Sequence, residues 1–187
     1  GLRPIFLDMT NLRIHKPSDA ELQMFTYSIY YGMNCLKGSI GLQQSGWVVT
    51  HDLWTGHVSD TQYQEESGIL ELQNDFAEMD LLESGEKIPF TNVFDKGYRI
   101  RLAAWRNGHQ LTLQPDFAKS DRKFQRKETL SSAQVAADRS GNERAARLSK
   151  MSGYLKRGLS NNQSLERFDQ AWLAWGFQIN FMFQKVL

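Results

Sequence analysis

Residues 35–54 read CLKGSIGLQQSGWVVTHDLW, and this stretch decides the fold class. Two runs rich in apolar and β-branched residues, 35–42 and 47–54, flank the polar connection Gln43-Gln44-Ser45-Gly46. The Ser-Gly pair in that connection is typical of a hairpin turn. Upstream, the mostly apolar segment 2–8 is typical of a short strand that delivers Asp8 at its C-terminal end. Together the three segments predict an antiparallel meander.

The remaining patterns predict helices and strands that do not alternate strictly. A helix over 61–76 can be capped by Ser59 or Asp60. The other expected elements are a strand or extended loop over 24–31, strands over 92–95 and 110–113, a short helix over 100–105, a charged loop over 116–128, a helical region over 130–156 interrupted at Ser140-Gly141, and a final helix over 164–186. This order predicts a mixed α/β fold and disfavours a doubly wound nucleotide-binding sheet.

Length and composition set the broad class. A chain of 187 residues with 41% hydrophobic and 23% charged residues fits one globular domain and excludes collagen-like or wholly disordered chains. No window approaches the roughly 20 apolar residues of a membrane span. Dinucleotide, phosphate-loop and serine-hydrolase glycine motifs are absent from the sequence. Cys35 is the single cysteine and is expected to be an inert core thiol.

Charge divides the chain into two unlike parts. Residues 1–97 hold 6 Lys/Arg and 14 Asp/Glu, whereas 98–187 hold 16 and 7. We therefore distinguish, within one domain spanning 1–187, an acidic sheet part over about 1–115 and a basic, helical part over about 116–187. The basic part can attract a polyanion such as nucleic acid, although a solvated helix surface would carry the same charges.

Two carboxylates carry the clearest chemical pattern. Asp8 and Asp95 each end a short apolar strand, so neighbouring strands would bring them to one edge of the sheet. Such oxygen ligands suit Mg²⁺ or Mn²⁺ in phosphodiester chemistry, but strand-end aspartates also cap turns. His51 and His57 flank Asp52 and could touch a site or be purely structural.

Several short motifs occur in a fixed order along nearly the whole chain. They are Leu7-Asp8-Met9-Thr10, Lys16-Pro17-Ser18, Thr26-Tyr27-Ser28, Thr55-Gly56-His57-Val58-Ser59-Asp60, Ser67-Gly68-Ile69-Leu70, Asp95-Lys96-Gly97-Tyr98 and Arg139-Ser140-Gly141-Asn142-Glu143-Arg144-Ala145. In this order they resemble the conserved blocks of DDE transposases of the PIF/Harbinger type. The joint occurrence carries the resemblance, because each motif alone is unspecific.

The resemblance implies a ribonuclease H-like fold, with a mixed sheet flanked by helices, and a metal-dependent DNA endonuclease and strand transferase. It implies that Asp8, Asp95 and Glu143 are the catalytic residues and hold Mg²⁺ or Mn²⁺, with two ions. Water would cut DNA at a transposon end, and the released 3′-hydroxyl would join target DNA. It also makes Asp60 a structural cap near the site and Asp138 a further acid outside the catalytic set.

Basic residues around Glu143 would then hold DNA phosphates. They are Arg139, Arg144, Arg147, Lys150, Lys156 and Arg157. A surface face or a salt bridge to the acidic part is the alternative for Arg144 and Arg147. Because Asp8 comes so early, we expect no upstream DNA-binding domain in this chain, which is then either an excised catalytic portion or a chain whose end recognition comes from a separate partner protein. A homodimer and action in the nucleus are further expectations, with the cytoplasm as the alternative for a bacterial protein, and no membrane is implied.

Three residues depart from the family pattern: Met9, Phe94 and Asn142. Met9 replaces a glycine, Phe94 a small residue and Asn142 an apolar residue. Each departure leaves the adjacent carboxylate intact. They favour a second hypothesis, a domesticated, catalytically silent module for binding DNA or protein. A third is another ribonuclease H-like nuclease, such as one that cuts RNA in a hybrid.

Overall fold

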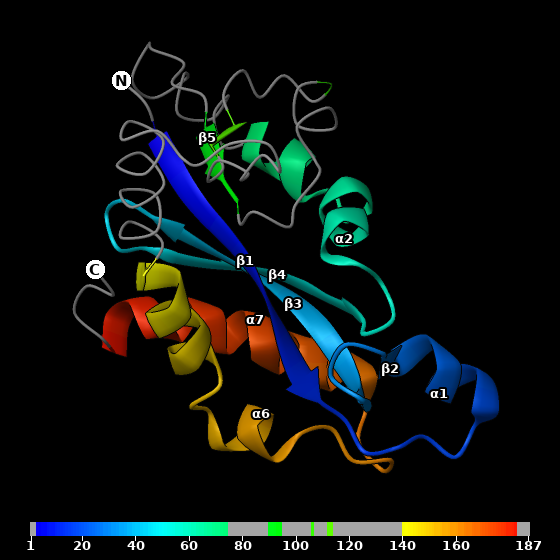
Figure 1. Cartoon of the computed structure of the whole chain (residues 1–187). Coiled ribbons are helices and arrows are strands. Elements are labelled where there is room, and N and C mark those ends of the chain that lie inside the picture. The colour runs from blue at the N-terminus through cyan, green and yellow to red at the C-terminus, as the bar shows by residue number, and fades with distance from the viewer. Residues whose placement is uncertain (1–2, 75–89, 95–105, 107–111, 114–139, 183–187) are drawn as a thin grey trace, which may run out of the picture.

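The central strand of the protein is β1 (Arg3–Arg13), which pairs antiparallel with β3 (Met33–Gln43) in the computed structural model (Figure 1). The structure describes residues 3–74, 90–94, 106, 112–113 and 140–182. On its other side β3 pairs antiparallel with β4 (Val48–Thr55). At the β3–β4 turn, Gly46 adopts φ of 86°, and its N–H donates to the carbonyl oxygen of Gln43 over 2.9 Å. The hairpin and the meander are therefore confirmed.

Two short strands extend the sheet in the parallel sense. β5 (Phe90–Val93) pairs parallel with β1, and β6 (Thr112–Leu113) pairs parallel with β5. The two-residue strand β2 (Tyr27–Ser28) pairs with the start of β3. The described residues thus form a six-stranded mixed sheet in which β1 lies between an antiparallel and a parallel neighbour.

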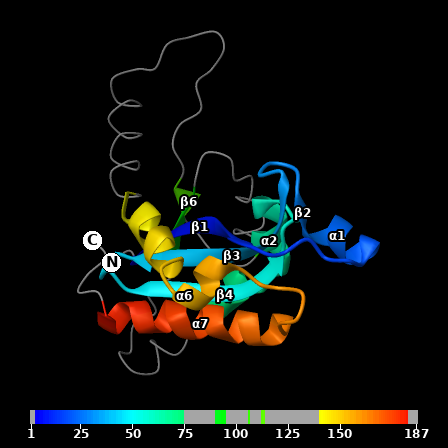
Figure 2. The same ribbon diagram turned by 90° about the horizontal axis from the view of Figure 1, so that it is seen from below.

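Helices cover both faces of this sheet. Successive side chains of β1 point to opposite faces, so each face has its own apolar core that a helix buries. Phe6, Leu12 and Ile14 join the larger core, which contains residues of α7 (Leu165–Met182), α6 (Gly153–Arg157) and the helical segment 140–149. Ile5 and Leu7 join the smaller core with residues of the helical segment 69–74. Figure 2 shows α7 running along β4, on which it packs. The predicted mixed α/β fold with flanking helices is confirmed.

The strand β1 is longer than the sequence pattern indicates. It continues past Asp8 to Arg13 because Met9–Arg13 pairs with β3 down to Cys35. Asp8 therefore lies within a strand, opposite Ile40, and the prediction that it ends the strand is wrong.

Helix boundaries supply the other differences. The predicted strand over 24–31 is wrong at its start, where α1 (Ala20–Thr26) forms because the Asp19 side chain accepts from the N–H of Leu22 over 2.7 Å. The helix expected over 61–76 divides into α2 (Asp60–Glu66), capped by Ser59, and the segment 69–74, with Gly68 at φ of 79° between them. The interruption expected at Ser140-Gly141 is wrong, since both residues are helical. The elements predicted over 100–105 and 116–128 lie outside the described residues.

Candidate functional site

Asp8 lies half-buried near the middle of β1, with one carboxylate oxygen 2.8 Å from the N–H of Met9, from which it accepts. Strand alternation puts it on the same face as Phe6 and Leu12. That face is covered by the helical segment 140–149, whose Ala145 belongs to the same core as Phe6. The carboxylate of Asp8 therefore belongs to the side of the sheet that carries Glu143.

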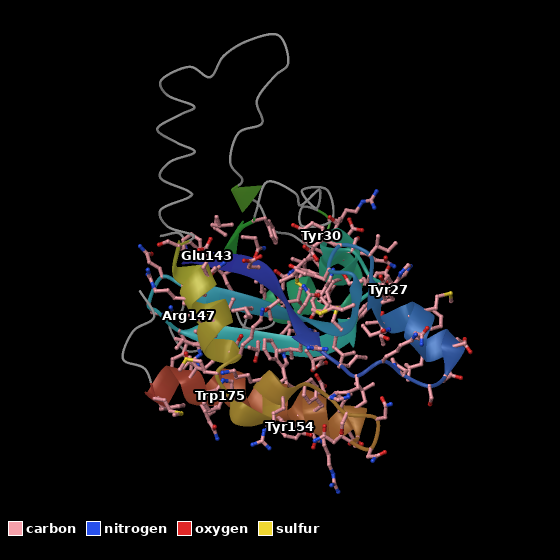
Figure 3. All side chains as sticks on the ribbon, turned by 60° about the horizontal axis from the view of Figure 1, so that its bottom comes forward. Tyr27, Tyr30, Glu143, Arg147, Tyr154 and Trp175 are labelled. Carbon is pink, nitrogen blue, oxygen red and sulfur yellow. The ribbon has the colours of Figure 1, made fainter. Side chains whose placement is uncertain are left out.

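Glu143 lies on the exposed face of the segment 140–149, and Figure 3 shows it with Arg147 on that helix. Glu143, Arg147 and Lys150 follow one another at spacings of four and three, so they form one stripe. The opposite face carries the buried residues Asn142, Ala145 and Ser149. The segment thus turns Glu143, Arg144 and Arg147 away from the core, and Lys150 follows directly after its last helical residue.

Lys150 connects this stripe electrostatically to Asp8. Although the lysine side chain is largely exposed, protein atoms crowd its ammonium group, and this burial lowers the pKa of Lys150. The charge of Asp8 acts in the opposite direction and raises that pKa. A lysine ammonium therefore lies within the field of the Asp8 carboxylate.

Asp95 lies outside the described residues, as do Arg139 and Asp138. The described chain reaches Phe94, which is completely buried and packs with Leu7 and Leu70 in the smaller core. Phe94 departs from the family pattern, and its ring is accommodated by that core.

Asn142 is the departure from the family pattern that lowers the stability of the fold. It is 1% exposed, and neither its amide nitrogen nor its amide oxygen has a hydrogen-bond partner among the described residues. A buried polar group without a partner costs about 1–3 kcal/mol. The residue before Glu143 is thus a source of instability in the helix that carries the candidate catalytic acid.

We expect Asn142→Leu, which keeps the number and branching of the side-chain heavy atoms, to stabilise the protein. Removal of an unpaired amide worth about 1–2 kcal/mol should raise Tm by roughly 2–8 °C in a domain of this size. Thermal unfolding followed by circular dichroism measures this shift. The exposed Gln178 of α7 provides the control Gln178→Leu, which should leave Tm nearly unchanged. An Asn142→Leu protein that melts at or below the wild-type temperature contradicts the argument.

The remaining candidate basic residues occupy two places. Arg144 and Arg147 are exposed on the segment 140–149, near Glu143. Lys156 and Arg157 are exposed in the last turn of α6, which lies by the C-terminal end of β1, where the N–H of Leu159 donates to the carbonyl oxygen of Arg13. The structure thus brings Lys150 near Asp8 but sets Lys156 and Arg157 further along β1.

His51, His57 and Asp60 have structural or peripheral positions. His51 Nδ1 lies 3.2 Å from the hydroxyl oxygen of Tyr63. The Tyr63 hydroxyl donates to the carbonyl oxygen of Asp52. Burial lowers the pKa of His51. Asp60 forms a 2.6 Å ion pair with the buried Lys37, while Ser59 rather than Asp60 caps α2. His57 is exposed. Cys35 is a buried free thiol, as predicted.

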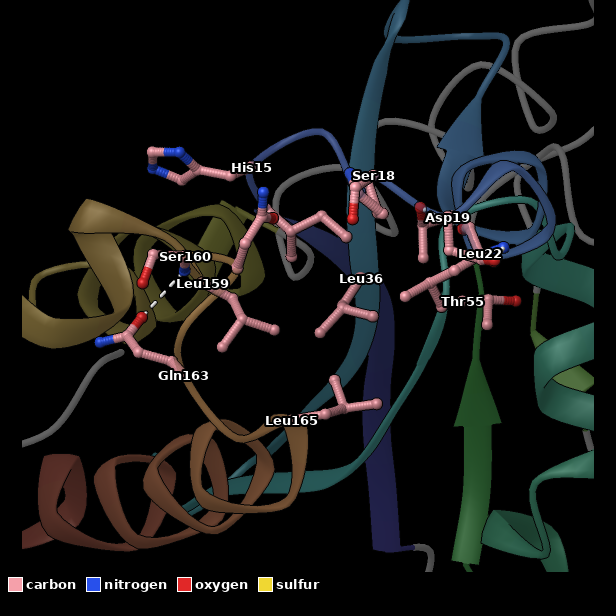
Figure 4. A pocket seen from close by; sticks show the side chains of 14 residues that line it. His15, Ser18, Asp19, Leu22, Leu36, Thr55, Leu159, Ser160, Gln163 and Leu165 are labelled. Carbon is pink, nitrogen blue, oxygen red and sulfur yellow. Dashed lines mark hydrogen bonds between the residues drawn. The ribbon is translucent and has the colours of Figure 1, made fainter.

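A cavity of about 210 Å³ lies between the C-terminal end of β1 and the loop that precedes α7 (Figure 4). Its wall is mainly apolar and includes Leu36, Leu159 and Leu165. At its edge the N–H of Ser160 donates to the Gln163 side chain over 2.9 Å. In the part of the chain that the structure describes, no group of three His, Cys, Asp or Glu side chains is placed to hold a metal ion, in this cavity or elsewhere.

A family model described as DDE superfamily endonuclease matches residues 7–175. The chain belongs to the DDE superfamily endonucleases. Comparisons with curated proteins and with solved structures give no match. The matched range of this DDE endonuclease includes Asp8, Asp95 and Glu143. Family membership supports a transposase-like nuclease that acts on DNA, with divalent metal as the usual cofactor of the family.

The helices of this DDE endonuclease, as far as they are described, include none that is both long and apolar enough to span a bilayer.

Proposed function

We propose that this chain is the metal-dependent catalytic domain of a transposase of the PIF/Harbinger type, with a ribonuclease H-like fold. It cuts phosphodiester bonds at transposon ends and joins the released 3′-hydroxyl to target DNA, acting in the nucleus. The observation that carries the proposal is the parallel register of β1 and β5, in which Phe6 pairs with Val93. Asp8 and Asp95 each follow two positions later in the sequence. Continuation of that register would set the two carboxylates side by side.

The donor set fits a hard divalent cation. Asp8 is half-buried on the face covered by the helical segment that carries Glu143, and carboxylate oxygens are the ligands that Mg²⁺ and Mn²⁺ prefer. Asp8, Asp95 and Glu143 would hold two such ions. When bound, these ions activate a nucleophile and stabilise the leaving oxygen of an in-line displacement.

The proposed activity consists of two reactions on DNA, and basic residues of the protein hold the phosphates in both. In the first reaction a water oxygen bonds to phosphorus and the bond to the 3′ oxygen breaks, which leaves a 3′-hydroxyl. In the second reaction the oxygen of that hydroxyl bonds to a phosphorus atom of target DNA, and the bond from that phosphorus to its 3′ oxygen breaks, which leaves a free 3′-hydroxyl on the target strand. Lys150 would neutralise charge on the phosphate beside Asp8, and Arg144 and Arg147 would hold neighbouring phosphates. Lys156 and Arg157 would contact the DNA further along.

The test is nicking of a labelled DNA duplex in the presence of Mg²⁺ or Mn²⁺, with EDTA as the control. We expect cleavage that needs the metal and yields 3′-hydroxyl ends. DNA binding without metal-dependent cleavage would instead support a domesticated, catalytically silent module. Preferential cleavage of RNA in a hybrid would support a different nuclease.

Lys150 provides a second test of the proposal. We expect Lys150→Ala to lower the cleavage rate at saturating DNA by about tenfold, or ~1.4 kcal/mol of transition-state stabilisation, because the ammonium lies in the field of Asp8. Lys156→Ala is the matched control. It should weaken DNA binding and lower the slope of log binding constant against log salt concentration by about one, without changing the cleavage rate at saturating DNA. Equal saturated rates for Lys150→Ala and wild type would contradict this role.

A further inference from the structure

A groove of about 660 Å³ lies at the C-terminal end of β1, next to α1 and β2. Its lining residues are Arg13, Ile14, Lys16, Ala20, Gln23, Met24, Tyr27, Ile29, Gly32, Met33, Asn34 and His57. The volume falls within the range of about 300–1,000 Å³ that ligand sites occupy. Arg13 is five positions after Asp8 on β1, or roughly 17 Å at strand spacing. The groove is therefore separate from the proposed metal site but lies on the same strand.

The charge of the groove favours an anionic occupant. Among the described residues, its lining contains the exposed basic residues Arg13, Lys16 and His57 and no Asp or Glu. Asp19, which caps α1, Glu21 in the first turn of α1 and Asp60, three residues after His57, are not among the lining residues. Phosphates are the anions that such a basic site recognises on nucleic acids.

Exposed aromatic rings lie in and next to this groove: Tyr27 lines it, and Tyr30 lies on the β2–β3 loop outside the lining. Tyr27 is 41% exposed and Tyr30 is 87% exposed, and the Tyr30 ring packs edge-on against Tyr31 with centroids 4.8 Å apart. Ile29, at 81% exposed, continues the apolar surface between them. Figure 3 shows Tyr27 and Tyr30 well away from Glu143 and Arg147. Several exposed apolar side chains close together in the chain mark a binding site more often than a single exposed ring does.

The segment that carries these rings is held in place by polar contacts. The Asn34 amide donates to the carbonyl oxygen of Gln23 and to the Thr26 hydroxyl, each over 2.8 Å. Gly32, at φ of 63°, donates its N–H to the carbonyl oxygen of Ser28 over 2.8 Å. Exposed rings on a fixed backbone lose little conformational entropy when a ligand stacks on them.

We propose that this groove binds single-stranded DNA, with Arg13, Lys16 and His57 on phosphates, one base stacked on Tyr27 and the strand continuing over Tyr30 on the adjoining β2–β3 loop. The proposal rests on the proposed function, because the strand would be a flank of the DNA cut near Asp8. Stacking requires unpaired bases, whose faces a duplex conceals, so the aromatic rings favour a single strand over a duplex.

The test measures binding rather than cleavage. Fluorescence anisotropy in EDTA compares a labelled single strand with a duplex of the same sequence. For the double variant Tyr27→Ala/Tyr30→Ala we expect a single-strand affinity lower by about 10- to 100-fold, since each stacked base is worth about 1–3 kcal/mol, and an unchanged duplex affinity. Phe177→Ala removes a ring that is 58% exposed on α7 and should change neither affinity.

A charge variant separates loss of binding from misfolding. Lys16 is exposed beyond the end of β1, so Lys16→Glu should leave the circular dichroism spectrum unchanged and weaken single-strand binding. Arg167→Glu, on the exposed surface of α7, is its control. The proposal is overturned if wild type does not bind the single strand, or if neither groove variant weakens binding more than its control. If the wild-type protein binds the single strand but does not nick DNA, the proposed function is overturned and the groove proposal stands. If it nicks DNA but does not bind the single strand, the groove proposal is overturned and the proposed function stands.

Discussion

Replacement of Asp8 by asparagine is expected to abolish metal-dependent DNA cleavage while the protein stays folded. The amide has nearly the shape of the carboxylate, and the 2.8 Å contact with the N–H of Met9 needs only an acceptor oxygen. The change therefore removes charge rather than packing. A fall in rate of about two to three orders of magnitude corresponds to ~3–4 kcal/mol of lost transition-state stabilisation.

The measurement is the initial rate of duplex nicking in Mg²⁺ or Mn²⁺, with circular dichroism as the check on folding. Asp95→Asn and Glu143→Gln should give losses of the same order, because all three carboxylates are proposed to hold the ions. Asp52→Asn is the matched control, since Asp52 is an exposed acid on β4. An Asp8→Asn protein that cuts at the wild-type rate would remove Asp8 from the site.

Replacement of Trp172 by alanine is expected to cause the largest loss of stability. The ring is completely buried, and its Nε1–H donates to the carbonyl oxygen of His51 over 2.8 Å, which ties α7 to β4. The ring also packs on Gly38, where an added Cβ would come within 2.7 Å of it. Truncation of a buried Trp costs about 3–5 kcal/mol, which should lower Tm by roughly 6–20 °C.

Thermal unfolding by circular dichroism gives the Tm difference directly. Trp47→Ala is the control, because Trp47 is 40% exposed at the β3–β4 turn and its truncation leaves no internal cavity. A Trp172→Ala protein whose Tm lies within a degree or two of wild type would show that α7 is not needed to hold the sheet.

The fold was predictable where local signals agreed. The hairpin follows from Ser45-Gly46 between two apolar runs, whereas the single helix predicted over 61–76 divides at Gly68. The α1 helix was missed because the aromatic and β-branched residues of 24–31 outweighed a single polar signal, the Asp19 cap. The true length of β1 depends on β3, a long-range partner that a local pattern does not contain.

The sequence names candidate site residues but does not contain their geometry. Asp8 and Glu143 followed from motifs, but the closeness of Lys150 to Asp8 depends on how the segment 140–149 packs across the sheet. The groove beside Arg13 was missed for a similar reason. Its signal was the aromatic run from Tyr27 to Tyr31, which gained meaning only when folding set it against basic residues from β1 and the following loop.

The pairing of β1 with two unlike neighbours also sets the order of folding events. Its pairing with β3 joins Arg13 to Cys35, a short separation, whereas its pairing with β5 joins Arg3 to Phe90. Closing the longer loop costs more chain entropy and is slower, so we expect the hairpin side of β1 to form first. During synthesis on a ribosome, the side of β1 that pairs with β5 would stay unpaired until β5 has emerged. A nascent chain could not cut DNA, because its proposed catalytic carboxylates would assemble only when the last long-range contacts close.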